Sequence, residues 1–278
     1  LLQDTPTTVY HPSKAFGYAL KALVCLFHHD WSDAKEAATQ SLDLNNALID
    51  YVALEKAGGP MKVATYAKGG NPEVLNYAYQ GSYSDNPAYT YGMISPELVT
   101  LYGSNDERLN LFFKTTGNSV YYFDEGSGAA LWNTSLTYTK FQYMAVGLRT
   151  AEVYLILAEA EARLGYIKEA TEVLNQLRVK RIKGDEATLA QPSTQKEMVQ
   201  AVINERRKEL LFGFHRYWDL KRLNVEADYA KTITRTFPIV TATTQHTYTL
   251  SPDSRLYVIP FPEDVRAKNT NITNNTDK

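Results

Sequence analysis

The chain has 278 residues, an apolar fraction of 44% and a formal net charge of −2. That length suits one large domain or two small ones, and the apolar content is sufficient for a sizeable core. The small net charge and the lack of a basic run argue against nucleic acid or an anionic membrane face as an electrostatic partner.

The first predicted element is a pair of helices over residues 12–44, in which small and apolar side chains recur at helical spacing. Cys25 is the one cysteine of the chain and lies on an apolar helix face, so we interpret it as a small buried hydrophobic residue. His28 and His29 are consecutive and would point apart, which makes them a poor metal pair. The sequence therefore predicts no disulfide, no metal site and no cofactor.

Residues 61–143 are predicted to form an irregular insertion of loops and short strands. Residues 71–80 alternate in polarity as a strand does, and residues 81–92 are rich in Gly, Ser, Asp, Asn and Pro, as loops are. A short helix is expected over 95–102, because Ser95 can cap it and is followed by a proline suited to the first helical position.

The central predicted element is a helical hairpin over 148–177, with its turn at Gly165. Glycine is the residue that adopts a left-handed backbone without steric cost, which suits a helix end. Alanines on this hairpin would let two helix backbones approach closely, as in a tetratricopeptide pair, which needs neighbours to cover its other side. One common offset relates four residues of the first pair to four of this one, namely Ala15, Ala22, Leu26 and Ala34 to Ala151, Ala158, Ala162 and Ala170.

A third pair is predicted over 194–223, broken at Gly213. Extended structure with a possible hairpin is expected over 225–249, and a short strand over 255–261. Charged residues in the third pair are interpreted as ion pairs that tie its first helix to its surroundings. They are Glu205, Arg206, Arg207, Lys208 and Glu209. Trp31 and Trp218, which lie inside the helix pairs, are assigned to packing.

Four segments of this chain, in order, resemble a SusD/RagB-like protein, a family of outer-membrane nutrient-binding lipoproteins of Bacteroidetes. The first is 11–42, with Asp30 and Trp31 at its turn, and the third is 148–165. The second segment is ISPELVTLYGSNDERLNLFF, in which Glu97, Leu98, Tyr102, Asp106 and Arg108 match. The fourth is the most specific, because ERRKEL, a glycine and HRYWDLKR follow one another, with YVIPFPEDVRAKNTNIT near the end. The chain looks like the C-terminal two-thirds or less of such a protein.

The resemblance implies a mostly α fold, with tetratricopeptide-like helix pairs forming a superhelical scaffold and one aromatic-rich insertion, all in a single domain over 1–278. It implies cell-surface binding of an oligosaccharide or polysaccharide nutrient. It also implies delivery of that glycan to a SusC-like TonB-dependent outer-membrane transporter. The signal peptide and lipid anchor of such a lipoprotein are expected to lie outside this chain, and Cys25 is not the lipidated cysteine.

The candidate binding residues lie in the insertion, because ten of the 20 tyrosines fall within residues 76–143. Sugar rings have a face of C–H groups that packs on flat aromatic side chains, while Asn and Asp side chains bind hydroxyls. We predict a ligand site made of Trp132, Tyr83, Tyr89, Tyr91, Asp85, Asn86 and Asn133. Each of these aromatic side chains could instead cover the core.

Two other classes of function stay open from the residues alone. An enzyme is not expected, because no nucleophile elbow, phosphate loop, zinc helix or dinucleotide fingerprint is present. The second class is a helical-repeat scaffold for protein interaction, or a peptide-capturing member of the same family. A groove lined by the helix pairs would favour a scaffold, whereas aromatic side chains gathered on the 81–143 loops would favour a glycan site.

Overall fold

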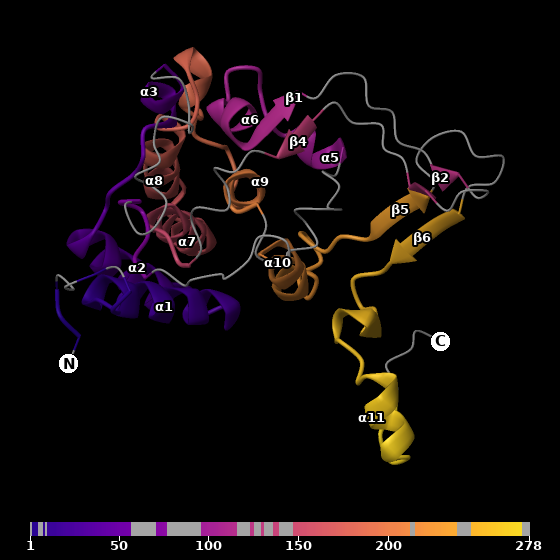
Figure 1. The fold of residues 1–278 in the computed structure, drawn as a ribbon. Helices are drawn as coiled ribbons and strands as arrows, with labels where there is room; N and C mark the ends of the chain where they lie inside the picture. Colours follow the sequence, from indigo (N-terminus) through magenta and orange to yellow (C-terminus); the bar gives the residue numbers. More distant parts are fainter. Residues whose placement is uncertain are drawn as a thin grey trace. The chain divides into compact units, whose positions relative to one another are not determined.

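The structure is a computed structural model, and the residues it describes are mostly helical, as the sequence predicts (Figure 1). It describes the chain except for residues 1, 5–7, 9, 57–70, 77–95, 116–122, 125–128, 131–135, 139–146, 212–214, 238–245 and 274–278. Contacts divide the chain into two compact units. The helical unit comprises 1–116 with 136–213, and the C-terminal unit comprises 117–135 with 214–278. The single-domain interpretation stays a prediction.

The predicted first helix pair is present as α1 (Lys14–Phe27) and α2 (Trp31–Leu44). Ser13 begins α1, because its side chain accepts a hydrogen bond from the backbone N–H of Phe16. The facing surfaces of the two helices are largely alanine, so the backbones come close enough for the Ser41 hydroxyl to donate to the carbonyl of Ala15 at 2.8 Å. The buried small residues therefore set the spacing of the pair.

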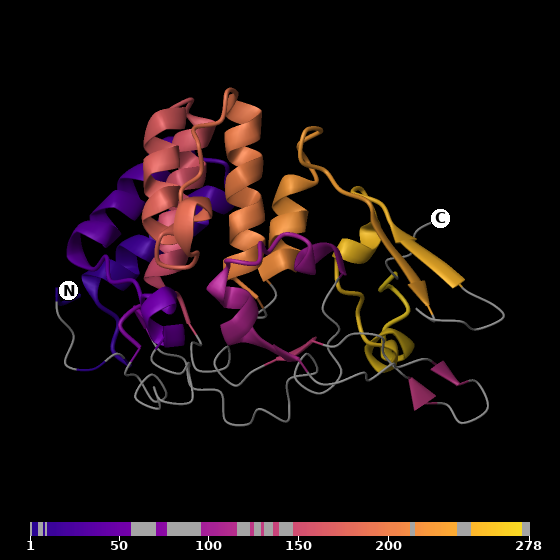
Figure 2. The same cartoon turned by 90° about the horizontal axis from the view of Figure 1, so that it is seen from above.

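The predicted central hairpin is α7 (Thr150–Arg163) and α8 (Ile167–Arg178), and Gly165 between them has φ +87°. Figure 2 shows α9 (Gln195–Glu209) alongside this pair, and α7 packs against α2, α8 and α9. Because it has neighbours on several sides, α7 is buried from Thr150 to Ala162 around its whole circumference. It is the central helix of the scaffold.

The residues that the alanine spacing relates are buried in both helix pairs. All eight matched residues are at most 3% exposed, and they lie at the contacts of α1 with α2 and of α7 with its neighbours.

The helix expected from Thr194 onwards is α9, and it begins with a capping box. The Thr194 hydroxyl accepts from the N–H of Glu197, and the Glu197 carboxylate accepts from the N–H of Thr194. The cap fixes the point at which α9 leaves the 180–193 connection.

Shorter elements of the helical unit lie within the insertion and on either side of it. They are α3 (Tyr51–Lys56), α5 (Pro96–Val99), α6 (Glu107–Phe112), β1 (Phe113–Thr115), β4 (Leu136–Tyr138) and a 3₁₀ turn over Gly184–Ala187. Tyr51 and Phe112 meet edge to face in a small core shared by α3 and α6. The α5 helix begins at the predicted proline. None of the described helices is long and apolar enough to cross a bilayer.

The C-terminal unit contains α10 (His215–Leu223) and a two-stranded antiparallel hairpin of β5 (Ile233–Phe237) and β6 (His246–Leu250). The hairpin expected within 225–249 is confirmed. The strand expected over 255–261 is wrong, because Arg255–Tyr257 form a 3₁₀ turn capped by the Ser254 hydroxyl. The remaining elements are β2 (Phe123–Asp124), paired with β3 (Ala129–Ala130), and α11 (Glu263–Lys268).

Candidate functional site

The predicted ligand residues all lie outside the described residues. Tyr83, Asp85, Asn86, Tyr89 and Tyr91 fall within 77–95, and Trp132 and Asn133 within 131–135. The structure describes how the segment that carries them is attached to the helical scaffold.

The two ends of the aromatic-rich segment 76–147 lie side by side at the scaffold. Val74 and Arg149 form an antiparallel bridge. The N–H of Leu75 donates to the carbonyl of Leu148 at 3.0 Å, and the N–H of Thr150 donates to the carbonyl of Glu73 at 2.8 Å. We call these paired residues, 73–75 and 148–150, the neck. The segment therefore leaves and rejoins the scaffold at one place, directly at the start of α7.

A second attachment holds the middle of the segment. Asp106 and Ile182 form an antiparallel bridge, and the N–H of Glu107 donates to the carbonyl of Arg181 at 2.8 Å. The N–H of Lys183 donates in turn to the carbonyl of Asn105 at 2.9 Å. The start of α6 is thus fixed to the stretch that follows α8.

Further along, β1 pairs with β4 in antiparallel register, from Phe113 opposite Tyr138 to Thr115 opposite Leu136. This pair closes the shorter stretch 116–135, which contains two of the predicted ligand residues. Backbone pairing therefore holds segment 76–147 at its ends, at its middle and at the β1–β4 pair.

Buried charges join these attachments to α9. We call Glu73, Arg108, Arg149, Arg181 and Glu209 the ion cluster. Glu209, at the end of α9, accepts from Arg181 Nε at 3.0 Å, from Arg108 Nη1 at 3.2 Å and from Arg149 Nη1 at 3.4 Å. Glu73 accepts from Arg181 Nη2 at 2.7 Å and from Arg149 Nη1 at 3.0 Å. Two carboxylates therefore connect the neck, the middle attachment and the scaffold.

A second group of charges extends the ion cluster along α9. Arg108 Nη2 bonds Asp106 Oδ2 at 2.7 Å and Glu205 Oε1 at 2.5 Å, and its side chain is 0% exposed. Glu205 also accepts from Arg178 Nη1 at 2.8 Å and pairs with Lys208 at 3.0 Å. The sequence-based interpretation of Glu205 and Glu209 as ion-paired residues is confirmed.

Electrostatics in the cluster favour the charged forms of its carboxyl groups. Burial alone would raise the pKa of Glu209, but the charges of Arg181, Arg149 and Arg108 outweigh it and hold that pKa well below its ordinary value of 4.5. The pKa of Glu205 is lowered in the same way, against burial, by Arg108, Lys208 and Arg178. A glycosidase needs a carboxyl group whose pKa is raised, so Glu205 and Glu209 are unsuited to be its general acid.

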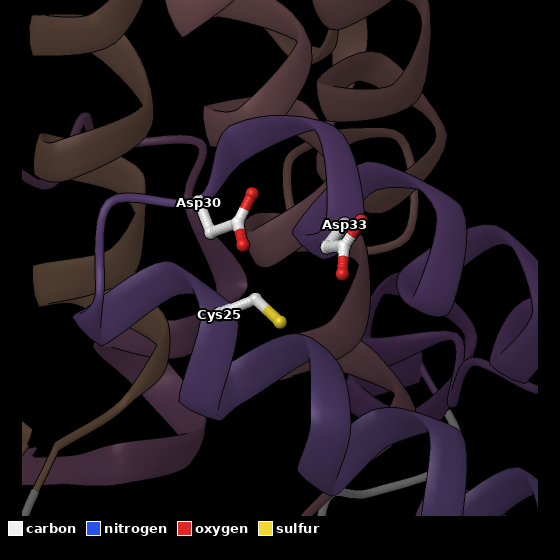
Figure 3. A group of neighbouring side chains, drawn as sticks. All are labelled: Cys25, Asp30 and Asp33. Carbon is white, nitrogen blue, oxygen red and sulfur yellow. The ribbon is translucent and has the colours of Figure 1, made fainter.

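The α1–α2 turn brings a possible metal-ligating group together. The thiol of Cys25 and the carboxylates of Asp30 and Asp33 point toward the same space, with their ligand atoms within 4.8 Å of one another (Figure 3). Burial, Asp30 and Asp33 raise the pKa of the thiol, so it is a poor thiolate ligand at neutral pH. Asp33 is also paired with Lys21 at 3.7 Å. Partly exposed acids beside a protonated thiol do not make a convincing metal site.

The two scaffold tryptophans differ in their surroundings. Trp31 stacks on His29 at 5.0 Å between ring centroids, and the guanidinium of Arg163 lies 4.8 Å from its centroid. Its assignment to packing is confirmed. Trp218 on α10 is 45% exposed, so its assignment to packing is wrong. The rings of Tyr217 and Trp218 meet edge to face, and Lys221 Nζ lies 5.3 Å from the centroid of Trp218.

Sequence reasoning missed three members of the ion cluster, Glu73, Arg149 and Arg181. Each lies near the end of a predicted element, and its partners are 28 to 108 residues away in sequence. The available signal was positional, because Glu73 and Arg149 flank the aromatic-rich segment 76–147.

Comparisons with known proteins agree with this architecture. The family model described as SusD family matches residues 76–277. A search of curated proteins finds no match. Among solved structures, a SusD-like protein from Bacteroides fragilis is 18% identical with a TM-score of 0.65, over 100% of this chain and 68% of its own.

Two structures from Bacteroides vulgatus are similar to the same degree. A SusD-like carbohydrate binding protein is 19% identical with a TM-score of 0.60, over 96% of this chain and 60% of its own. A SusD superfamily protein is 22% identical with a TM-score of 0.61, over 99% of this chain and 61% of its own. At these identities the likeness shows the fold, and the chain spans 60–68% of the length of the three proteins.

Proposed function

The chain belongs to the SusD family, and we propose on that basis that it binds an oligosaccharide or polysaccharide nutrient at the cell surface. The observation that carries the proposal is the attachment of the aromatic-rich segment 76–147 to the helical scaffold, at its neck and at its middle. Loops that carry ligand-binding side chains need a rigid support, because ordering them at the moment of binding costs affinity.

The ligand contacts we propose are aromatic platforms with polar neighbours. Trp132, Tyr83, Tyr89 and Tyr91 would pack on sugar rings, and Asp85, Asn86 and Asn133 would bind hydroxyl groups. The name of the Bacteroides vulgatus relative, a carbohydrate binding protein, supports this class of ligand. No catalytic step is proposed, and the paired carboxylates of α9 are consistent with a binding protein.

We further propose that the protein works at the outer membrane, held there by a lipid anchor. It would pass its glycan to a SusC-like TonB-dependent transporter. Both statements rest on membership of the family.

The test is affinity gel electrophoresis of the protein on a panel of soluble polysaccharides, with Trp132→Ala run beside it. Trp218→Ala is the matched control, because Trp218 is an exposed tryptophan outside the predicted site. We expect retardation by at least one glycan, lost in Trp132→Ala and kept in Trp218→Ala.

Two other outcomes would change the account. Retardation that survives Trp132→Ala would keep the function and move the site away from that residue. No retardation on any glycan, repeated with the full-length protein, would overturn glycan binding and favour the peptide-capturing or scaffold alternative.

A further inference from the structure

We propose that Arg149 is a positioning residue that clamps the neck, where the aromatic-rich segment leaves and rejoins the helical unit, to the end of α9. The inference rests on the proposed function for its consequence, the affinity for a glycan. The clamp itself stands on described contacts alone.

Arg149 is placed at the point where the segment ends. It is the N-cap residue of α7, follows Leu148 of the neck and is bridged through its backbone to Val74. Its backbone therefore already belongs to both strands of the neck, and its side chain is the part that extends beyond them.

The Arg149 side chain joins the neck to α9 through two residues. Nη1 donates to Glu73 Oε2 at 3.0 Å and to Glu209 Oε1 at 3.4 Å, and Nη2 donates to the backbone carbonyl of Glu209 at 3.2 Å. Glu73 is part of the neck and Glu209 ends α9, so one planar guanidinium fixes the position of the neck relative to the scaffold. A single ammonium group could not reach all these acceptors with the same geometry.

The surroundings make the clamp stiff. The carboxylates of Glu73 and Glu209 are 0% exposed, and Arg181 also binds both of them, at 2.7 Å and 3.0 Å. Because the acceptors are fixed by a second arginine, a change at Arg149 alters the neck while leaving the Glu73–Arg181–Glu209 connection in place. Arg149 is also the more peripheral arginine, since its side chain is 12% exposed.

The chain offers a matched control in Arg206. Its Nη2 donates to Glu152 Oε1 at 2.7 Å, and both side chains are almost completely buried. That pair joins α9 to α7 within the scaffold. Arg206→Gln therefore removes a buried ion pair of the same type that is not one of the contacts described for the neck.

The first arm of the experiment is limited proteolysis of the ligand-free protein, with the cleavage sites mapped by mass spectrometry. Arg149→Gln is expected to speed cleavage within 76–147 while helices α7, α8 and α9 stay uncut. Arg206→Gln is expected to leave cleavage of that segment at the wild-type rate. Equal cleavage of the segment in the two variants, or no acceleration in Arg149→Gln, would overturn the proposal.

The second arm measures affinity for a polysaccharide that retards the wild-type protein. Arg149→Gln should bind about tenfold more weakly, a loss of about 1.4 kcal/mol, and Arg206→Gln should bind as the wild type does. Equal loss in both variants would mean that stability, not positioning, sets the affinity. If the wild type binds no glycan, the proposed function fails, and the proteolysis arm still decides the role of Arg149.

Lysine variants keep the experiment decisive if a glutamine variant does not fold. Arg149→Lys and Arg206→Lys both retain the charge and lose the planar fork. We expect Arg149→Lys to restore part of the protection against proteolysis within 76–147, because its charge still favours Glu73 and Glu209. No difference between the two lysine variants would contradict the positioning role.

Discussion

Glu209 and Arg181 form a two-armed ion pair inside the helical unit, with Nε–Oε2 at 3.0 Å and Nη2–Oε1 at 3.1 Å and both side chains 0% exposed. Parallel hydrogen bonds between a guanidinium and a carboxylate are among the strong contacts of proteins, and their geometry is specific. Because the same carboxylate also meets Arg108 and Arg149, it is the residue on which the attachments of the insertion converge.

Glu209→Gln should destabilise the protein strongly, because it leaves the charges of Arg108, Arg149 and Arg181 with one carboxylate fewer in the interior. Removing one partner of a buried pair costs about 3–5 kcal/mol. The measurement is the free energy of unfolding from urea denaturation at pH 7. Glu172→Gln is the control, because Glu172 forms an exposed pair with Lys168 at 3.8 Å and such pairs contribute little. Similar losses of unfolding free energy in the two variants would contradict the claim that Glu209 holds the buried arginines together.

Glu161 on α7 should destabilise the fold when it is charged, whereas the charged form of Glu209 stabilises it. Its side chain is 6% exposed, its Oε2 has no hydrogen-bond partner among the described residues, and burial raises its pKa above the ordinary 4.5. A carboxyl group with a raised folded-state pKa favours folding when it is protonated, and that contribution is lost as the pH rises from 4.5 through the folded-state pKa.

Glu161→Gln should therefore raise the Tm at pH 7, and the gain should shrink as the pH falls through the raised folded-state pKa toward 4.5. Thermal unfolding followed by circular dichroism between pH 4 and pH 7 measures it. Glu36→Gln, at an exposed position of α2, should change the Tm little at any of these pH values. A lower Tm for Glu161→Gln at pH 7 would show that the charged carboxylate is stabilised in the fold.

Gly165→Ala should lower the free energy of unfolding by about 1 kcal/mol, because a left-handed backbone is unfavourable for a residue with a Cβ atom. The φ of Gly165 is +87°, and a Cβ there would meet no atom within 4 Å, so the cost comes from the backbone alone. Gly165→Asn should cost less, since asparagine tolerates this conformation better. Equal losses of unfolding free energy in the two variants, measured by urea denaturation, would mean that the left-handed backbone is not the cause of the loss.

Ala22→Leu tests the close approach of α1 and α2. Ala22 is 0% exposed in the core that these helices share, so a larger side chain must push them apart, at a cost of about 1–3 kcal/mol. Val24→Leu, two residues along the same helix at a site 50% exposed, should be nearly neutral. A neutral Ala22→Leu would mean that the alanine face does not set the helix spacing.

The helix pairs were predictable because their signals are local. The alanine spacing in 12–44 and 148–177 and the glycine at 165 each act within a few residues, and the structure confirms both helix pairs and the turn at Gly165. The strand expected over 255–261 was wrong because a short apolar run does not separate an extended segment from a 3₁₀ turn.

Burial of charge could not be predicted in the same way. Glu152, Glu159 and Glu161 lie off the apolar stripe of α7, yet all three are buried, because α7 is covered on several sides. Periodicity identifies one apolar face and says nothing of a second layer. The ion cluster depends on residues brought together by the fold, such as Glu73 and Arg181, which are 108 positions apart. The predicted ligand residues lie outside the described part of the chain and stay predictions.

The most direct measurement of the central claim is a fluorescence titration of a protein in which Trp132 is the sole tryptophan. The chain has three tryptophans, so Trp31→Phe with Trp218→Phe leaves Trp132 alone. Titration with an oligosaccharide cut from a retarding polysaccharide should shift the Trp132 emission with a saturation curve that matches the Kd from calorimetry. Calorimetric binding with no change in Trp132 emission would contradict the site on this segment, and no binding by either method would contradict glycan capture itself.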